Sequence, residues 1–136
     1  MAQGMIADIL FQQGEFDEAL RIRKDEVIPV YEKMGDVWAT AVAKGKIADI
    51  LFAQGRRDEA LRIWREEALP IYEQLGDVRS LYGGLANYAQ MLLLDPTPAR
   101  IAVARNCLER SKSIADAFKL EFSDHLRDLL ARLRNM

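Results

Sequence analysis

The chain has 136 residues, of which 50% are hydrophobic and 29% are charged, which suits one globular domain and is too apolar for a disordered segment. Its 19 lysines and arginines face 21 aspartates and glutamates, and this net charge of −2 disfavours a nucleic acid as partner. One cysteine (Cys107), one histidine (His125) and no run of roughly 18 apolar residues exclude a disulfide framework, a zinc site with two imidazoles and a membrane span, so we expect a soluble, cytoplasmic protein.

Helices are predicted along the whole chain, because apolar residues recur at intervals close to 3.6. The apolar residues of the second predicted helix fall at helical spacing, and charged residues occupy the other side; the apolar ones are Phe16, Ala19, Leu20, Val27, Val30, Tyr31 and Met34. The predicted helices cover residues 2–13, 16–34, 36–53, 57–75, 77–94, 98–118 and 123–135. No segment shows the alternation of a strand, so the fold class is all-α.

An internal repeat organises these helices. Ala2–Val37 aligns without a gap to Ala43–Val78, at a constant offset of 41, and 23 of the 36 positions are identical. A third, more divergent copy includes Leu85–Leu94. We expect a single domain, 1–136, with repeats at 1–35, 36–76 and 77–119 and a C-terminal capping helix at 123–135.

Glycine and aspartate mark where the predicted helices end and begin. Gly14 and Gly55 can adopt the left-handed conformation that ends a helix, and the next helix begins at or just before Asp17 and Asp58. The pair Gly35-Asp36, which recurs as Gly76-Asp77, predicts the same arrangement between repeats. Each repeat is therefore a pair of helices.

Pro29 and Pro70 lie deep inside the second helix of their repeats. A proline in a helix interior removes one backbone hydrogen bond and collides with the carbonyl four residues back, at a cost of about 3 kcal/mol. We expect a continuous helix with a recurrent kink at each proline, in which Asp25 and Glu66 carry the freed carbonyls. The alternative is a helix that ends and restarts there.

The segment IADILFAQGRRDEAL, with Ala48, Leu51, Gly55, Ala60 and Leu61 at its key positions, resembles the tetratricopeptide repeat. The 41-residue period is longer than the usual unit of this family and is similar to the repeats of kinesin light chains and of many bacterial arrays. The resemblance covers residues 1 to about 118 and implies an α-solenoid of antiparallel helix pairs.

The same resemblance implies that a partner binds along the concave surface, which the first helix of each repeat lines. Transferred position by position, it predicts the partner-binding residues Gly4, Asp8, Phe11, Gly45, Asp49, Phe52, Ala86, Gln90 and Leu93. Asp8 and Asp49 would repel a terminal carboxylate, so a carboxylate clamp is not expected. We expect the groove to accept an apolar or mildly basic peptide or helix.

Two interpretations of the glycines in the first helices stay open, because glycine costs roughly 1 kcal/mol relative to alanine there. Gly4, Gly45 and the pair Gly83-Gly84 could allow consecutive first helices to pack closely, or they could leave a groove floor open for a partner. For the tryptophans, packing between repeats is favoured at Trp64, and packing and binding are equally weighted at Trp38.

The sequence favours a non-catalytic scaffold for protein–protein interaction, with no cofactor and no metal. Alternatives are a sensor segment of a larger signalling ATPase or effector protein and a self-assembly module. The first repeat has no capping helix before it, and this apolar end predicts either a longer array or a homodimer.

Overall fold

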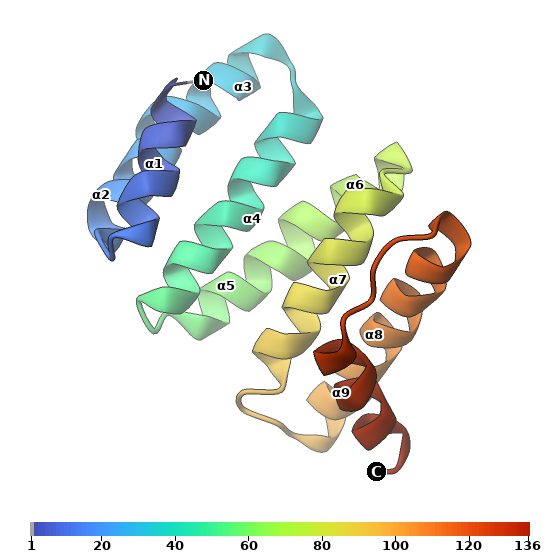
Figure 1. Cartoon of the computed structure of the whole chain (residues 1–136). Helices are drawn as coiled ribbons and strands as arrows, with labels where there is room; N and C mark the ends of the chain where they lie inside the picture. Colours follow the sequence, from blue (N-terminus) through green and yellow to red (C-terminus); the bar gives the residue numbers. More distant parts are fainter. Residues whose placement is uncertain (1) are drawn as a thin grey trace. The chain divides into compact units, whose positions relative to one another are not determined.

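A computed structural model describes residues 2–136, and these residues form helices and no strand (Figure 1). The elements are α1 (Ala2–Gln12), α2 (Phe16–Ile22), η1 (Arg23–Val27), α3 (Ile28–Met34), α4 (Val37–Ala53), α5 (Arg57–Ile63), η2 (Trp64–Ala68), α6 (Leu69–Leu75), α7 (Val78–Leu92), α8 (Pro98–Phe118) and α9 (Asp124–Arg134). The predicted all-α fold of paired helices is confirmed.

The chain divides into two compact units, one up to Ile71 and the other Tyr72–Met136, and each is described by itself. The single domain expected from the length stays a prediction.

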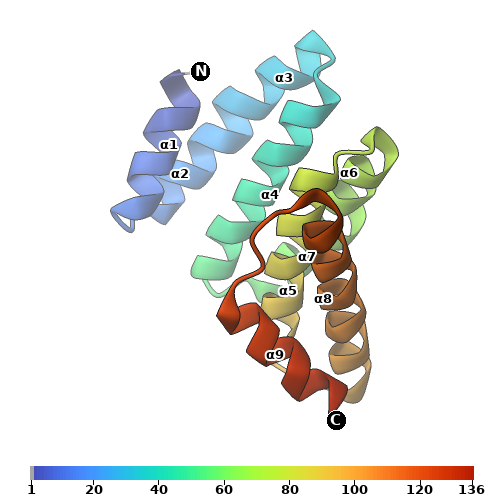
Figure 2. The same ribbon diagram turned by 45° about the vertical axis from the view of Figure 1, so that its right-hand side comes forward.

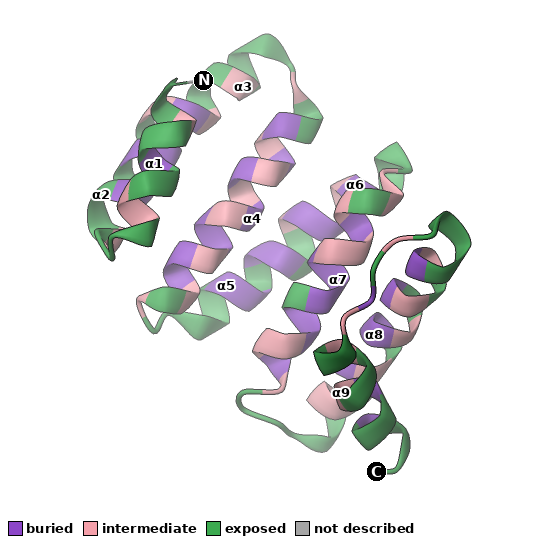
Figure 3. Ribbon diagram, viewed as in Figure 1, coloured by how far each residue is buried: buried purple, intermediate pink, exposed green. Residues whose placement is uncertain are grey.

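The first unit is built from two helix pairs that share one core. α1 packs against α2 and η1, and α4 packs on α2, η1 and α3 of the preceding pair. The core cluster consists of Ala7, Ile22, Val27 and Ala43, with Leu10, Ile28 and Tyr31 packed against it. Figure 3 shows that the buried residues of α4 continue along most of its length. Small residues such as Ala7 and Ala43 at the helix contacts let the backbones approach closely.

The predicted helix boundaries are confirmed by the backbone. Gly14, Gly35, Gly55 and Gly76 all have positive φ, between 65° and 83°, immediately after a helix. At the start of α4 the Asp36 carboxylate accepts a hydrogen bond of 2.9 Å from the Ala39 amide. Asp77 does the same at α7, where it accepts from the Ser80 amide at 3.1 Å.

The second helix of each pair adapts to its proline by widening one turn. The Ile28 amide donates to the Arg23 carbonyl and the Leu69 amide to the Trp64 carbonyl, so each bond spans five residues rather than four. These π-helical turns directly precede Pro29 and Pro70. The helix continues through the proline, as expected, and the widened turn is the adaptation that the sequence did not indicate.

The extra residue in the π turn corrects one prediction about the apolar face. Val30 and Met34, predicted on the apolar side of their helix, are exposed. Tyr31, predicted on the same side, packs against the core, and so does Ile28, which was not predicted there. Because the π turn holds one extra residue, each later side chain points about 100° away from where an uninterrupted α-helix would place it. The apolar residues before and after residues 23–27 therefore do not follow one uninterrupted 3.6-residue period.

In the second unit, α8 packs against α7 and α9 packs against α8 (Figure 2). Leu130 and Leu133 of α9 are buried. The Arg134 guanidinium pairs with the Glu109 carboxylate of α8 through two bonds of 2.6 and 2.7 Å. Among the described residues 2–136, none of the helices has both the length and the apolar character needed to cross a bilayer.

Gly45 provides a test of the close packing in the first unit. A methyl group at Gly45 would lie 2.9 Å from Cη2 of Trp64, whereas one at Gly4 meets nothing closer than Arg23 Nη1 at 4.0 Å. Because the buried indole has little room to move, we expect Gly45→Ala to lower the free energy of unfolding by about 1–3 kcal/mol. The matched variant Gly4→Ala should raise it by roughly 0.5 kcal/mol. Urea titration followed by circular dichroism measures both, and equal effects would contradict the packing described.

Candidate functional site

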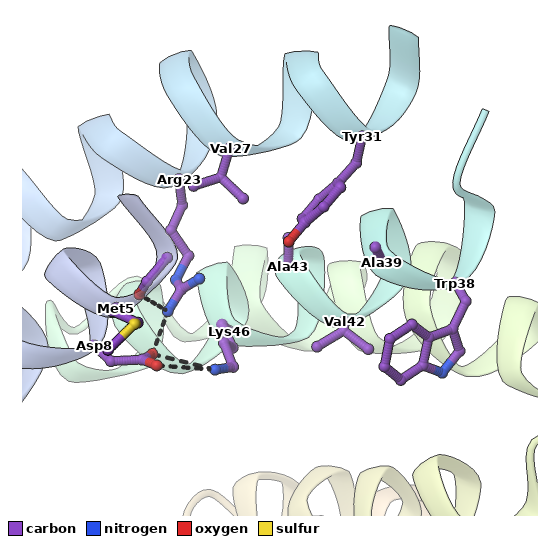
Figure 4. A pocket seen from close by; sticks show the side chains of 11 residues that line it. Met5, Asp8, Arg23, Val27, Tyr31, Trp38, Ala39, Val42, Ala43 and Lys46 are labelled. Atoms are coloured by element: carbon purple, nitrogen blue, oxygen red, sulfur yellow. Dashed lines mark hydrogen bonds and ion pairs between the residues drawn. The ribbon is translucent and has the colours of Figure 1, made fainter. Parts of the chain in front are cut away.

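A hollow of the first unit lies between α1 and α4, beneath η1 and α3 (Figure 4). We call it the α1–α4 pocket. It has a volume of about 280 Å³. Its lining residues are Gly4, Met5, Asp8, Arg23, Val27, Tyr31, Trp38, Ala39, Val42, Ala43 and Lys46. Most of these side chains are apolar, and the charged ones gather at one end.

A smaller hollow of about 190 Å³ adjoins the charged end. It is lined by Asp8, Phe11, Gln12, Arg23, Lys46, Asp49 and Ile50. Asp8, Arg23 and Lys46 line both hollows, so their side chains form the partition between them. The two hollows together make a groove that is apolar over one part and charged at its middle.

The partition is an ion cluster centred on Asp8. Its carboxylate accepts a hydrogen bond from Arg23 Nη2, and it pairs with Lys46 Nζ at 3.2 Å to Oδ1 and 3.3 Å to Oδ2. Arg23 Nη2 also lies 3.4 Å from the Gly4 carbonyl. Figure 4 shows Arg23 reaching down from η1 and Lys46 reaching across from α4 toward the same carboxylate. The two cations compensate the negative charge that the sequence placed here.

Arg23 is buried to an unusual degree for a charged side chain, with only 5% of its surface exposed. Burial lowers the pKa of its guanidinium, although nearby Asp8 opposes the shift. Its Nε has no hydrogen-bond partner among the described residues. In the second repeat the same position holds Trp64, whose buried Nε1 also lacks a partner there. Arg23 therefore carries a charge to a place where the neighbouring repeat has an indole.

Asp49 contributes a second carboxyl group to the smaller hollow. Burial raises the pKa of Asp49 to about 6, and the cations of Lys46 and Arg23 only partly oppose this shift. At neutral pH the charge of this carboxylate is therefore costly, and it is lost in mildly acidic solution. The predicted acidic character of the groove is reduced both here and at Asp8.

The structure brings together four of the residues predicted for partner binding. Gly4 and Asp8 line the α1–α4 pocket, and Asp8, Phe11 and Asp49 line the smaller hollow. Phe11 also contacts the ring of Phe16, with 5.4 Å between the ring centroids. These positions on α1 and α4 follow the register that the family resemblance implies.

The remaining predicted residues lie elsewhere. Gly45 is buried under the ring of Trp64, so its packing partner belongs to the second helix of its own repeat, and it lines neither hollow of the groove. Phe52 is half-buried, and the Arg57 guanidinium lies 5.4 Å from its ring centroid. Leu93 is half-buried at the end of α7.

In the second unit, the predicted residues Ala86 and Gln90 line a separate pocket of about 300 Å³. This pocket also includes Tyr82 and Asn87 of α7 and Ser123 and Leu126 at the start of α9. Gln90 Nε2 donates to the Ala86 carbonyl within α7 at 3.2 Å. The Tyr82 hydroxyl donates to the Glu121 carbonyl at 2.9 Å, which holds the chain that enters α9.

Sequence reasoning missed several residues that shape the groove, above all Arg23, Lys46 and Val42. The signal for the first two lay in the repeat alignment. Arg23 aligns with Trp64, and Lys46 aligns with Met5, so both stand at positions where the two similar copies differ. Differences between close copies mark places where one copy carries a property that the other does not.

The groove combines apolar side chains with one small ion cluster. Within residues 2–136, no cluster of three or more histidine, cysteine, aspartate or glutamate side chains has the arrangement of a metal site. Burial raises the pKa of the Cys107 thiol, which keeps this buried cysteine protonated and weakly nucleophilic. An apolar chamber with a neutralised charged end is suited to hold a side chain of another molecule.

The raised pKa of Asp49 predicts how this residue affects stability with pH. Because the folded state holds the proton more tightly than the unfolded chain, Asp49 lowers stability above pH 6 and has no effect below its ordinary pKa of 3.8. We expect Asp49→Asn to raise the free energy of unfolding by roughly 1 kcal/mol at pH 7 and by much less at pH 4. Urea titrations of both proteins at the two pH values test this, and a loss of stability at pH 7 would contradict it.

Comparison with known proteins agrees with this arrangement. A model of the family described as tetratricopeptide repeat matches residues 40–75, which include most of α4 and all of α5, η2 and α6. No curated protein matches the chain. Tetratricopeptide repeats are non-catalytic and generally mediate interactions between proteins. Residues 40–75 therefore have the sequence pattern of a tetratricopeptide repeat.

Proposed function

We propose that this protein is a non-catalytic interaction scaffold that binds a peptide or helix of a partner protein in the α1–α4 pocket. The observation that carries the proposal is the apolar chamber formed by Met5, Trp38 and Val42, which is accessible from the first-helix side. Met5 and Trp38 keep much of their surface exposed. Apolar and aromatic side chains in an accessible pocket are typical of the places where a partner is held.

The size of the pocket supports a side chain as its occupant. Its volume of about 280 Å³ is below the roughly 300–1,000 Å³ typical of pockets for small-molecule ligands. An apolar side chain of a peptide uses such a pocket as an anchor, while the rest of the peptide lies along the groove.

The charges around the pocket refine the chemistry of the partner. The Asp8 carboxylate is occupied by Arg23 and Lys46, and the Asp49 carboxylate lies close to both cations. A basic peptide would have to compete with these internal cations for the carboxylates. The groove therefore favours an anchor that is apolar and uncharged, and the mildly basic partner expected from the sequence has less support.

Several expectations from the sequence stay predictions. They are the cytoplasmic location, the exclusion of nucleic acid as a partner, the sensor segment of a larger signalling protein and the positions of the second-unit residues in a binding surface. None of these contributes to the proposal for the α1–α4 pocket.

A charge inside the apolar chamber tests the proposal. Peptides are selected from a random displayed library on the wild-type protein, and their affinities are compared with the variant Val42→Glu. The introduced carboxylate would lie one helical turn before Lys46, a pairing that favours the helix, so the fold should persist. We expect the peptides to share an apolar residue, to shift the emission of Trp38 to shorter wavelength and to bind the variant at least about tenfold more weakly.

The control for this experiment is Val103→Glu, which places the same charge at an exposed valine of α8 in the other unit. Binding to this variant should equal that of the wild type. Selected peptides that bind Val42→Glu and the wild type equally would remove the α1–α4 pocket as the binding site.

A further inference from the structure

A second apolar surface of α1 is not used by the pocket. Ala2, Ile6 and Ile9 are spaced by four and three residues, so they form one stripe along the helix, which we call the outer stripe. Ile6 is 48% exposed and Ile9 is 55% exposed. Isolated exposed aliphatic residues are ordinary on a protein surface, but a continuous stripe of them on one helix marks a contact surface.

The second repeat shows what this stripe does when it has a partner. The residues at the equivalent positions are identical in type, Ala43, Ile47 and Ile50, and there both isoleucines are buried, at 3% and 2% exposure. They lie on α4, which packs against α2, η1 and α3. The outer stripe is therefore a copy of a surface that, within this chain, is covered by packed helices.

A polar contact at the end of α4 completes the comparison. Gln54 Nε2 donates to the Asp17 carboxylate of α2 at 2.7 Å. The equivalent residue of the first repeat, Gln13, is exposed and continues the outer stripe. The outer stripe thus ends at the side-chain amide of Gln13, which can donate and accept hydrogen bonds, just as the covered stripe of α4 ends at Gln54.

The charge distribution of α1 shows which partner suits the outer stripe. In a two-fold symmetric pair, residues near the axis meet their own counterparts, so any charge there would repel itself. The sole charged residue in the sequence of α1 is Asp8, which is paired with Arg23 and Lys46 at the pocket. The polar residues beside the outer stripe are the neutral amides Gln3 and Gln12.

The second unit limits how copies could associate. α9 packs against α8 with Leu130 and Leu133 buried, and Arg134 pairs with Glu109. If copies stacked head to tail as the repeats of the first unit do, the outer stripe would pack on α8, and α9 already covers part of that helix. Pairing of like surfaces, by contrast, needs only the outer stripe and closes as a dimer.

From these observations we infer that the outer stripe of α1 is a self-association surface, on which a second copy of this chain docks its own α1 about a two-fold axis. The inference is independent of the proposed peptide site, because Ile6 and Ile9 do not line the α1–α4 pocket. A single helix of 11 residues gives a small interface. We therefore expect a dissociation constant on the order of 10 μM.

The experiment measures the mass of the chain by analytical ultracentrifugation over concentrations from about 1 to 500 μM. Under the inference the wild type changes from monomer to dimer with rising concentration. Ile9→Gln, a neutral change to a good helix former, weakens association at least about tenfold. A wild type that stays monomeric throughout overturns the inference, and so does a mass that grows beyond the dimer.

Opposite charges at Ile9 test the symmetry itself. Ile9→Glu and Ile9→Lys should each be monomeric with wild-type helicity by circular dichroism, and their equimolar mixture should regain dimers because opposite charges now meet near the axis. Val103→Glu serves as the control and should dimerise like the wild type. Dimers of Ile9→Glu alone, or a mixture that stays monomeric while Ile9→Gln dimerises as the wild type does, would place the interface elsewhere and overturn the inference.

Discussion

The first unit depends on one constraint, which is that a pair of helices cannot bury its own apolar surface. α4 resolves this for the first pair by packing on α2, η1 and α3, and its Ala43, Ile47 and Ile50 are buried. Both contacting surfaces are apolar, and small residues such as Ala7 let the helices approach each other closely. The same constraint creates the groove, because helices that must pack side by side leave a depression between consecutive first helices.

One exchange between the repeats sets the character of that groove. Where the second repeat buries Trp64 over Gly45, the first repeat buries Arg23 near Gly4. A buried guanidinium requires a counter-charge, and Asp8 supplies it together with Lys46. The ion cluster is thus best understood as the consequence of placing a cation at a position built for an aromatic ring. It divides the groove and leaves an apolar chamber on one side.

The repeat alignment and the helical period predicted almost all of the fold, because both depend on local spacing that the backbone obeys. The glycines with positive φ and the aspartate caps at Asp36 and Asp77 follow from chemistry within a few residues. The site was less predictable, since Arg23, Asp8 and Lys46 come from three different elements whose contacts depend on tertiary packing. The sequence placed Gly45 on the groove because helical register alone cannot tell that Trp64 already covers it.

The π turns before Pro29 and Pro70 constrain which parts of the sequence must be copied together when a repeat is duplicated. If one of these turns returned to the ordinary helical pitch with the same number of residues, the following half of the helix would rotate by about 100° about its axis. That rotation would carry Val30 and Met34 inward and Ile28 and Tyr31 toward solvent. Proline, widened turn and the displaced pattern of side chains after it must therefore be duplicated together, as a single heritable block, each time the repeat is copied.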